Sequence, residues 1–346
     1  MKARAWHKIW NIKTVNNLVR ATSEGLYCEP GNFFIDPWKP VQTALITHAH
    51  SDHAHAGSAQ YFCAEKCLPL LKHRIGHENK YHALKYGEKF KIGDTVISFH
   101  PAGHILGSSQ VRIEYKGKVW VVSGDFKRGE DPSCDEFEVV HCDVFISEAT
   151  FALPIYRWES GEVTAKKIFD WWQSDLERPS LLFCYALGKS QRVLAELKKF
   201  TDKKVYLHGA VENLTEIYRK NGIDLIDTAP VASMEKGYSF KGDLIIAPPS
   251  AHRSTWMKRF KDPQTAFASG WMQVRGVRRR KGYEKGFVLS DHADWIELNR
   301  TIEQTGAKTV YLTHGKTDVL ERYLTEKGYE VRLFKTEYED QEEASS

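Results

Sequence analysis

The sequence predicts an α/β protein in which one domain, built from both ends of the chain, is interrupted by an inserted domain with a mostly parallel sheet. Short strands dominate up to about residue 150, whereas helical and strand segments alternate from there to about residue 286, which is typical of a parallel sheet. After residue 287 the earlier pattern returns, and histidines again stand directly after strands. We therefore expect the two ends of the chain to meet at one site.

The expected domain boundaries follow from this change of pattern. We assign residues 1–154 to the first part of the outer domain, 155–286 to the inserted domain and 287–336 to the second part of the outer domain. Residues 337–346 are acidic and small, and we expect a disordered tail. A chain of 346 residues with 42% hydrophobic residues is long enough for two domains with sizeable cores.

Apolar runs separated by turn residues predict the elements of the first part. Turns are expected at Glu29-Pro30-Gly31, Gly93-Asp94 and Lys116-Gly117, so that neighbouring strands form hairpins. One helix is expected at 68–75. The expected strands span residues 17–28, 32–36, 43–47, 60–64, 87–104, 111–115, 118–123 and 143–147.

In the inserted domain and the second part of the outer domain, the sequence predicts helices that alternate with strands. In the insert, helices at 163–176 and 190–200 are expected to alternate with strands at 180–185, 204–208 and 243–247. The second part is expected to contain strands at 287–290 and 309–313 with a helix at 294–305 between them.

Composition limits the partners and the compartment. The formal charge of +4 permits a polyanionic partner without demanding one, and 12% aromatic residues are compatible with base stacking, although core packing is the commoner explanation. Six cysteines in a chain this long predict reduced thiols in a cytoplasmic protein. The first ten residues are basic without an apolar core, and no apolar run approaches the ~18 residues of a membrane span, so we expect neither a signal peptide nor a membrane.

One six-residue stretch carries the strongest chemical signal. His48, His50, Asp52 and His53 directly follow the strand expected at 43–47. Imidazole and carboxylate groups suit zinc and manganese, and one tetrahedral ion rarely needs more than three protein ligands. Four ligands on one loop therefore suggest two ions, and two ions roughly 3.5–4 Å apart are the usual apparatus for hydrolysing phosphate esters.

Further candidate ligands stand at or just after other expected strands, where open α/β folds place their sites. These candidates are His104, Asp125, His292 and His314. A lone histidine near a strand end is more often a surface or hydrogen-bonded residue. We apply that interpretation to His7, His55, His73, His77, His82, His100, His141 and His208.

The stretch Thr-His-Ala-His-Ser-Asp-His at 47–53 resembles the signature loop of the metallo-β-lactamase fold, an αββα sandwich with a di-metal site. By this match one ion would be held by His48, His50 and His104, the other by Asp52, His53 and His314, with Asp125 between them. Asp36 matches the first motif of the fold, which implies that it orients a ligand histidine. A turn residue before Pro37 is the alternative for Asp36.

Motifs around three later residues are similar to motifs A, B and C of the β-CASP nucleases, which carry an inserted domain within this fold. The three residues are Glu148, His292 and His314. Residues 185–191 and 268–271 resemble segments of the insert, and the layout is most similar to the bacterial ligase-associated DNA exonucleases, relatives of RNase J, the pre-mRNA cleavage nuclease and Artemis. The resemblance implies that His292, paired with Glu148, supplies or orients the proton for the leaving oxygen. A purely structural pair is the alternative.

Two groups of residues are candidates for phosphate contacts. Lys189 and Ser190 open a predicted helix whose free N–H groups suit a phosphate, although a simple N-cap role is the alternative for Ser190. A basic run leads directly to His292 and would suit backbone phosphates, although charge runs are usually solvated faces. Its arginines are Arg275, Arg278, Arg279 and Arg280.

The leading functional expectation is an exonuclease dependent on two zinc or manganese ions that degrades DNA, 5′→3′ by resemblance, and serves repair with a ligase. An RNA-processing nuclease is the alternative, because family members that act on RNA keep a histidine where His314 stands, whereas eukaryotic DNA members often lack it. The chain has no recognisable RNA-binding extension of the RNase J kind, which favours DNA. An insert of over a hundred residues disfavours a small-molecule hydrolase, and the full ligand set disfavours a non-catalytic binder. The sequence makes no prediction of the oligomeric state.

Overall fold

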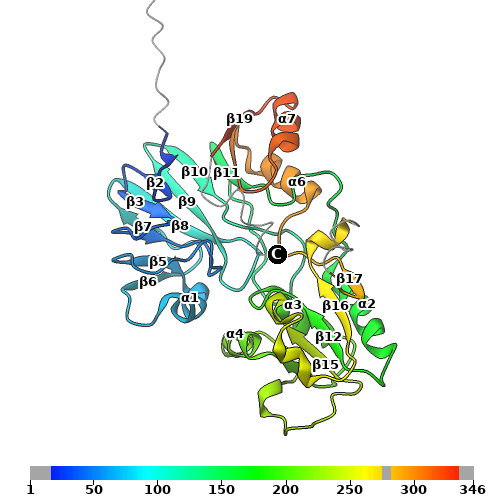
Figure 1. Cartoon of the computed structure of the whole chain (residues 1–346). Coiled ribbons are helices and arrows are strands. Elements are labelled where there is room, and N and C mark those ends of the chain that lie inside the picture. Colours follow the sequence, from blue (N-terminus) through cyan, green and yellow to red (C-terminus); the bar gives the residue numbers. More distant parts are fainter. Residues whose placement is uncertain (1–16, 275–281, 335–346) are drawn as a thin grey trace, which may run out of the picture.

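The computed structural model describes residues 17–274 and 282–334, and their strands form three sheets (Figure 1). The first sheet has six strands in chain order, antiparallel from β1 to β3 and parallel from β3 to β6. Its strands are β1 (Val19–Ala21), β2 (Leu26–Cys28), β3 (Phe33–Ile35), β4 (Ala44–Leu45), β5 (Tyr61–Ala64) and β6 (Tyr81–Leu84).

The second sheet joins both ends of the chain. Its seven strands lie in the order β19-β18-β11-β10-β9-β8-β7, antiparallel from β7 to β10 and parallel from β10 to β19. They are β7 (Phe90–Ile92), β8 (Thr95–Pro101), β9 (Ser109–Tyr115), β10 (Lys118–Val122), β11 (Val144–Glu148), β18 (Thr309–Thr313) and β19 (Glu330–Leu333). Strand β18 pairs with β11 across more than 160 residues of chain, as expected from the return of the early pattern near the C-terminus.

The third sheet is entirely parallel, as predicted for the insert, and lies at the lower right of Figure 1. Its order is β14-β13-β15-β12-β16-β17. The strands are β12 (Ser180–Phe183), β13 (Val205–Leu207), β14 (Thr228–Pro230), β15 (Leu244–Ala247), β16 (Gln264–Ala268) and β17 (Lys285–Phe287).

Helices cover the sheets. The α-helices are α1 (Leu68–Ile75), α2 (Gly161–Gln173), α3 (Lys189–Leu197), α4 (Gly209–Lys220), α6 (Trp295–Thr305) and α7 (Asp318–Glu326). Short 3₁₀ helices are η1 (Glu65–Cys67), η2 (Val231–Ser233), η3 (Pro249–Ala251), η4 (Thr255–Arg259) and η5 (Gly270–Gln273). Among residues 17–274 and 282–334, no helix is long and apolar enough to span a bilayer.

The core explains why the middle of the second sheet is apolar on both faces. Ile35 of the first sheet and Ile146 of β11 belong to one buried cluster, whereas Phe145 of β11 packs with Leu298 of α6 in another. Because successive side chains of a strand point to opposite faces, all five residues of β11 are buried. Strand β11 therefore ends at a buried residue, Glu148.

Several sequence predictions need correction. The strand expected at 17–28 is two strands, because Thr22 N–H donates to Gly25 O in a tight turn between them. The strand expected at 287–290 in the outer domain is β17, which ends at Phe287 and pairs with β16 of the third sheet. Elements β6, β14, β16, β19, α4 and α7 were not predicted. The tail expected at 337–346 lies outside the described residues.

Candidate metal centre

Asp36 contacts two residues of the loop that follows β4, Thr47 and His53. Asp36 stands directly after β3 with a left-handed backbone (φ 43°), a conformation that costs a non-glycine residue roughly 1–3 kcal/mol. Its carboxylate accepts hydrogen bonds from Thr47 N (2.8 Å) and Thr47 Oγ1 (2.6 Å), and lies 2.8 Å from His53 Nδ1. Because the hydrogen of the Thr47 hydroxyl is donated to Asp36, the hydroxyl oxygen accepts a hydrogen bond from His48 Nδ1 at 3.0 Å. The Nε2 lone pairs of both histidines are thereby directed away from Asp36.

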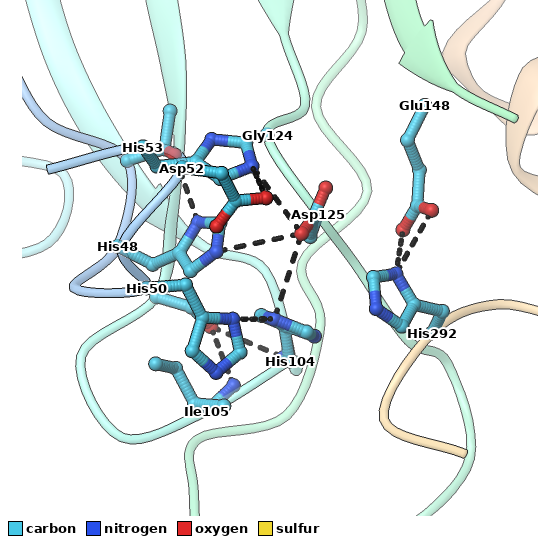
Figure 2. A network of polar contacts seen from close by, with 12 residues as sticks. His48, His50, Asp52, His53, His104, Ile105, Gly124, Asp125, Glu148 and His292 are labelled. Atoms are coloured by element: carbon cyan, nitrogen blue, oxygen red, sulfur yellow. Dashed lines mark hydrogen bonds and ion pairs between the residues drawn. The ribbon is translucent and has the colours of Figure 1, made fainter. Parts of the chain in front are cut away.

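Asp125 is the point on which these nitrogens converge (Figure 2). Its Oδ2 atom lies 3.4 Å from His48 Nε2, 3.4 Å from His53 Nε2 and 3.7 Å from His104 Nε2. Asp125 follows β10 through Gly124, where any Cβ would lie 2.7 Å from Thr47 Cβ, so a glycine is needed for the two loops to approach.

A fourth histidine completes the cluster. His50 Nδ1 lies 3.0 Å from His104 Nε2, and His104 Nδ1 donates to the carbonyl oxygen of Asp291 at 2.7 Å. Single ligand atoms of His48, His50, His104 and Asp125 all lie within 4.8 Å of one another. The structure therefore brings one of the two predicted ligand sets to metal-binding distance.

The donor atoms fit a divalent cation. The Nε2 atoms of His48 and His53 are buried without a hydrogen-bond partner, and such a buried polar atom costs about 1–3 kcal/mol unless something binds it. Burial, followed by the charge of His48, lowers the pKa of His50 to about 4, and burial with the charge of His292 lowers the pKa of His104 well below its usual range. Both imidazoles are consequently neutral near pH 7, which is the form that binds a metal.

The other predicted ligand set is looser. Asp52 Oδ2 lies 3.6 Å from His53 Nε2, and the Asp52 side chain is 39% exposed. The ring of His314 lies 5.5 Å from that of His53, and His314 has a left-handed backbone (φ 56°) just after β18. Burial opposes protonation of His53, but the Asp125 and Asp52 carboxylates outweigh burial and raise the pKa of His53 well above its usual value. Of this set, His53 directly approaches Asp125, whereas Asp52 and His314 lie around His53.

A histidine–glutamate pair lies beside the cluster. His292 Nδ1 is 3.0 Å and 3.2 Å from the two carboxylate oxygens of Glu148, which also accepts from Phe126 N at 2.8 Å. Burial disfavours the imidazolium, yet the carboxylates of Glu148 and Asp125 outweigh burial and raise the pKa of His292 to about 10. His292 is therefore protonated at neutral pH and carries a proton that it could give away.

One cavity of about 660 Å³ opens onto both groups. His50, Asp125 and His292 line it from the outer domain, and Tyr185 and Trp271 line it from the segments around the third sheet. Residues from the loop after β4, from the segments after β10, β12 and β16 and from the segment before α6 thus share one cavity.

The predicted phosphate contacts are placed differently from one another. Lys189 lines the cavity, is 4% exposed and forms a 2.8 Å ion pair with Asp291. Ser190 is fully buried, and its hydroxyl donates to the Tyr185 carbonyl oxygen at 2.7 Å. It is neither part of the cavity wall nor the N-cap of α3, which is Gly188. The remaining predicted contacts, Arg275, Arg278, Arg279 and Arg280, lie outside the described residues.

Sequence reasoning missed three participants. Thr47 forms hydrogen bonds to both Asp36 and His48. Asp291 accepts a hydrogen bond from His104 and forms an ion pair with Lys189. Thr47 and Asp291 both stand next to a predicted ligand in the sequence, which is the signal that could have drawn attention to them. Trp271 of the cavity wall ends the segment 268–271 that resembles the insert, but a tryptophan after a strand most often packs in a core, so no role at the site was predicted for it.

No protein-family model matches the chain. The chain is 29% identical over 313 residues to a "Probable DNA ligase" of Opitutus terrae, covering 89% of this chain and 30% of that protein. It is 23% identical over 211 residues to an "RNase J-like protein" of Methanocaldococcus jannaschii, covering 52% of this chain and 50% of that protein. It is also 31% identical over 128 residues to "Endoribonuclease YSH1" of Gibberella zeae, covering 35% of this chain and 15% of that protein. The chain thus spans between about a seventh and half of these relatives.

A solved structure supports the fold alone. The crystal structure of a protein of unknown function from Enterococcus faecalis superposes with a TM-score of 0.57 at 13% identity, covering 85% of this chain and 79% of that one. The sequence relatives and the buried cluster of histidines and aspartate together confirm the resemblance drawn from the motifs. The chain is therefore similar to the β-CASP nucleases of the metallo-β-lactamase fold.

Proposed function

We propose that this chain is a di-metal-dependent phosphodiesterase that degrades DNA from an end. The observation that carries the proposal is one cavity that is lined both by residues of the ligand cluster around Asp125 and by His292, which Glu148 holds in place. Hydrolysis of a phosphodiester needs positive charge at the phosphate, which bound metal ions would supply, and a proton for the leaving oxygen. The cavity offers candidate ligands for the ions and a candidate proton donor.

The residues divide into two ligand sets around a shared carboxylate. One ion would be held by His48, His50 and His104, the other by Asp52, His53 and His314, with Asp125 between them. Two zinc or manganese ions held there would supply Lewis acidity at the phosphate. Asp36 holds His53 and, through Thr47, His48 in the orientation that this requires. The same strand ends and shared core support an αββα sandwich for the outer domain.

His292 is the proton donor in this proposal. Water attacks phosphorus and releases one proton to the solvent, the bond from phosphorus to the leaving oxygen breaks, and the proton on His292 passes to that oxygen. Glu148 fixes the Nδ1 side of the ring and stays fixed itself by the Phe126 N–H group, so the other ring nitrogen is available on the side of the cavity.

DNA is the substrate that we favour. The match to a protein named as a probable ligase covers most of this chain, which supports a role in repair alongside a ligase. By family resemblance we further propose 5′→3′ digestion, and we place the protein in the cytoplasm. The six unpaired cysteines are consistent with that compartment. We propose that residues 155–286 recognise the polynucleotide, with Lys189 and the Arg275–Arg280 run near its phosphates.

An RNA-processing activity is the second candidate. Matches to an RNase J-like protein and to an endoribonuclease favour it, as does the histidine at position 314. One assay separates the candidates: 5′- and 3′-end-labelled DNA and RNA are incubated with purified protein and Zn²⁺, Mn²⁺ or a chelator. Progressive shortening of DNA alone supports the proposal, whereas trimming of RNA with intact DNA of every end structure contradicts it. Hydrolysis of a lactam or thioester with no effect on either polymer would indicate a small-molecule hydrolase.

A further inference from the structure

The third sheet presents two aromatic side chains to the cavity that holds the metal cluster. Tyr185 follows β12, and Trp271 lies in η5 directly after β16. Strands β12 and β16 are parallel neighbours, so both residues stand beyond the same carboxyl edge of the sheet. Both line the cavity together with Asp125 and His292.

The topology of the sheet singles out this edge independently of the metal cluster. From β12 the chain runs to β13 and β14 on one side, and after β15 it crosses β12 to reach β16 and β17 on the other side. The strand order therefore reverses between β12 and β16. In open α/β sheets ligands bind outside the carboxyl ends of the strands at such a reversal. Tyr185 and Trp271 stand at the two sides of that crevice.

The aromatic ring of Phe151 lies between His292 and Trp271. The Phe151 ring is 5.9 Å from the His292 ring and 4.8 Å from the Trp271 ring. Phe151 is buried, whereas Trp271 is half-buried and lines the cavity. Gly270 makes this packing feasible, because a Cβ there would lie 2.7 Å from the Phe151 ring. Phe151 thus supports Trp271 from behind.

The opposite side of the crevice is built from α3 and the turn before it. Tyr185 is half-buried, and the ammonium of Lys189 lies 4.5 Å from the centre of its ring. Lys189 is itself held by its ion pair with Asp291. The Tyr185 ring is therefore fixed and lies beside a positive charge, which suits a ligand that carries both an aromatic ring and a phosphate.

We propose that Tyr185 and Trp271 form a nucleobase subsite that stacks the base of the nucleotide next to the phosphodiester being cut. The inference rests on the proposed function and narrows its substrate to a single-stranded end, because a base inside a duplex is already stacked on both faces. Every base has a π-face, so such a subsite tolerates any sequence. The cavity volume of about 660 Å³ falls within the range of small-ligand pockets, roughly 300–1,000 Å³, which leaves room for a single nucleotide.

The test compares single-stranded oligothymidylates that are intact or that lack one base, with the abasic position moved along the strand. With Mn²⁺-loaded protein, KM rises about 10- to 100-fold when the base next to the cut is missing and changes little elsewhere. Trp271→Ala raises KM for the intact strand by a similar factor and leaves KM for that abasic strand unchanged, whereas Trp271→Phe keeps most of the affinity. Tyr185→Leu behaves like Trp271→Ala.

Trp256→Ala is the matched control, because Trp256 is also half-buried in a 3₁₀ helix of the insert but packs against His208, 4.8 Å between ring centres. Indifference of the wild-type protein to the missing base overturns the inference without any variant, and so does an equal effect of Trp271→Ala on both strands. If no strand is cut, the nuclease proposal has failed separately. Quenching of tryptophan fluorescence by intact but not abasic strands then tests the stacking alone.

Discussion

Lys189 Nζ lies 2.8 Å from Asp291 Oδ1, and each of these side chains is only 5% exposed. The pair joins the first turn of α3 to the residue that precedes His292. The carbonyl group of Asp291 also accepts the hydrogen bond from His104 Nδ1. A single residue of the insert therefore helps to hold both a metal-ligand candidate and the proposed proton donor.

Replacing Lys189 by methionine should destabilise the protein and lower kcat. Burial opposes ionisation of Asp291, but the Lys189 charge outweighs it and keeps the pKa of Asp291 well below its usual range, so the variant leaves a buried carboxylate unpaired. Breaking one side of a buried pair costs about 3–5 kcal/mol. Chemical denaturation and steady-state kinetics check this, with Lys189→Arg expected to restore much of both. Lys198→Met at the exposed end of the same helix is the control, and an equal loss there would contradict the assignment.

Removing divalent metal should lower the melting temperature as well as stop cleavage. The buried Nε2 atoms of His48 and His53 lose their partner when no cation is bound. A ligand that binds only the folded state at 100 times its dissociation constant contributes about 2.7 kcal/mol. Calorimetry with and without chelator, followed by addition of Zn²⁺ or Mn²⁺, measures the shift. Adding metal should raise the melting temperature of the wild-type protein clearly and leave that of His50→Ala unchanged. Identical melting in all samples would refute metal binding at this cluster.

Asp36→Asn should weaken metal affinity about 10- to 100-fold while the protein still folds, because groups behind metal ligands have effects of that size. The amide cannot accept from Thr47 and also hold His53 as a carboxylate does. Titration of the metal-free protein with Zn²⁺ gives the affinity directly. Asp170→Asn, on an exposed face of α2, should bind the metal normally. Equal affinities of the two variants would leave Asp36 without the orienting role.

The pH profile should depend on Glu148. A histidine whose pKa is raised keeps its proton below that pKa and loses it as the pH rises through it, so a reaction that uses the proton declines on the alkaline side. Bound cations repel the imidazolium and bring the decline below the value of about 10 that holds without them. Glu148→Gln removes the carboxylate and should move the decline of kcat to lower pH by more than one unit.

The control for this profile is another histidine–glutamate pair of the same protein. His100 Nδ1 lies 3.1 Å from Glu138 Oε1, and neither residue lines the cavity that contains His292. Glu138→Gln should therefore leave the alkaline limb in place. Coincident limbs in the wild type and Glu148→Gln would show that His292 is only a structural partner of Glu148.

Much of the candidate metal centre could be proposed from the sequence because its chemistry is local. Three histidines and an aspartate within six residues require no knowledge of the fold, and a strand that ends at such a loop places them at one sheet edge. The parallel sheet of the insert was likewise predictable from the alternation of helices and strands. Some failures occurred where signals were short, as at the tight turn after Thr22 and in the edge strands β6, β14 and β19. The helices α4 and α7 are longer and were also missed, although buried apolar residues recur along them at helical spacing.

By itself, the sequence determined which residues are candidate metal ligands, the alternation of helices and strands in the inserted segment and the family that the chain resembles. Only the tertiary structure decided which of those donors meet, because the distance between His104 Nε2 and Asp125, or between His292 and Glu148, depends on how far each strand extends and on which partner it pairs with. It also decided that Lys189 is committed to Asp291 and that Trp271 borders the site. The separation along the chain is 21 residues for His104 and Asp125 and 144 residues for His292 and Glu148. Packing between such segments is not encoded by a local pattern.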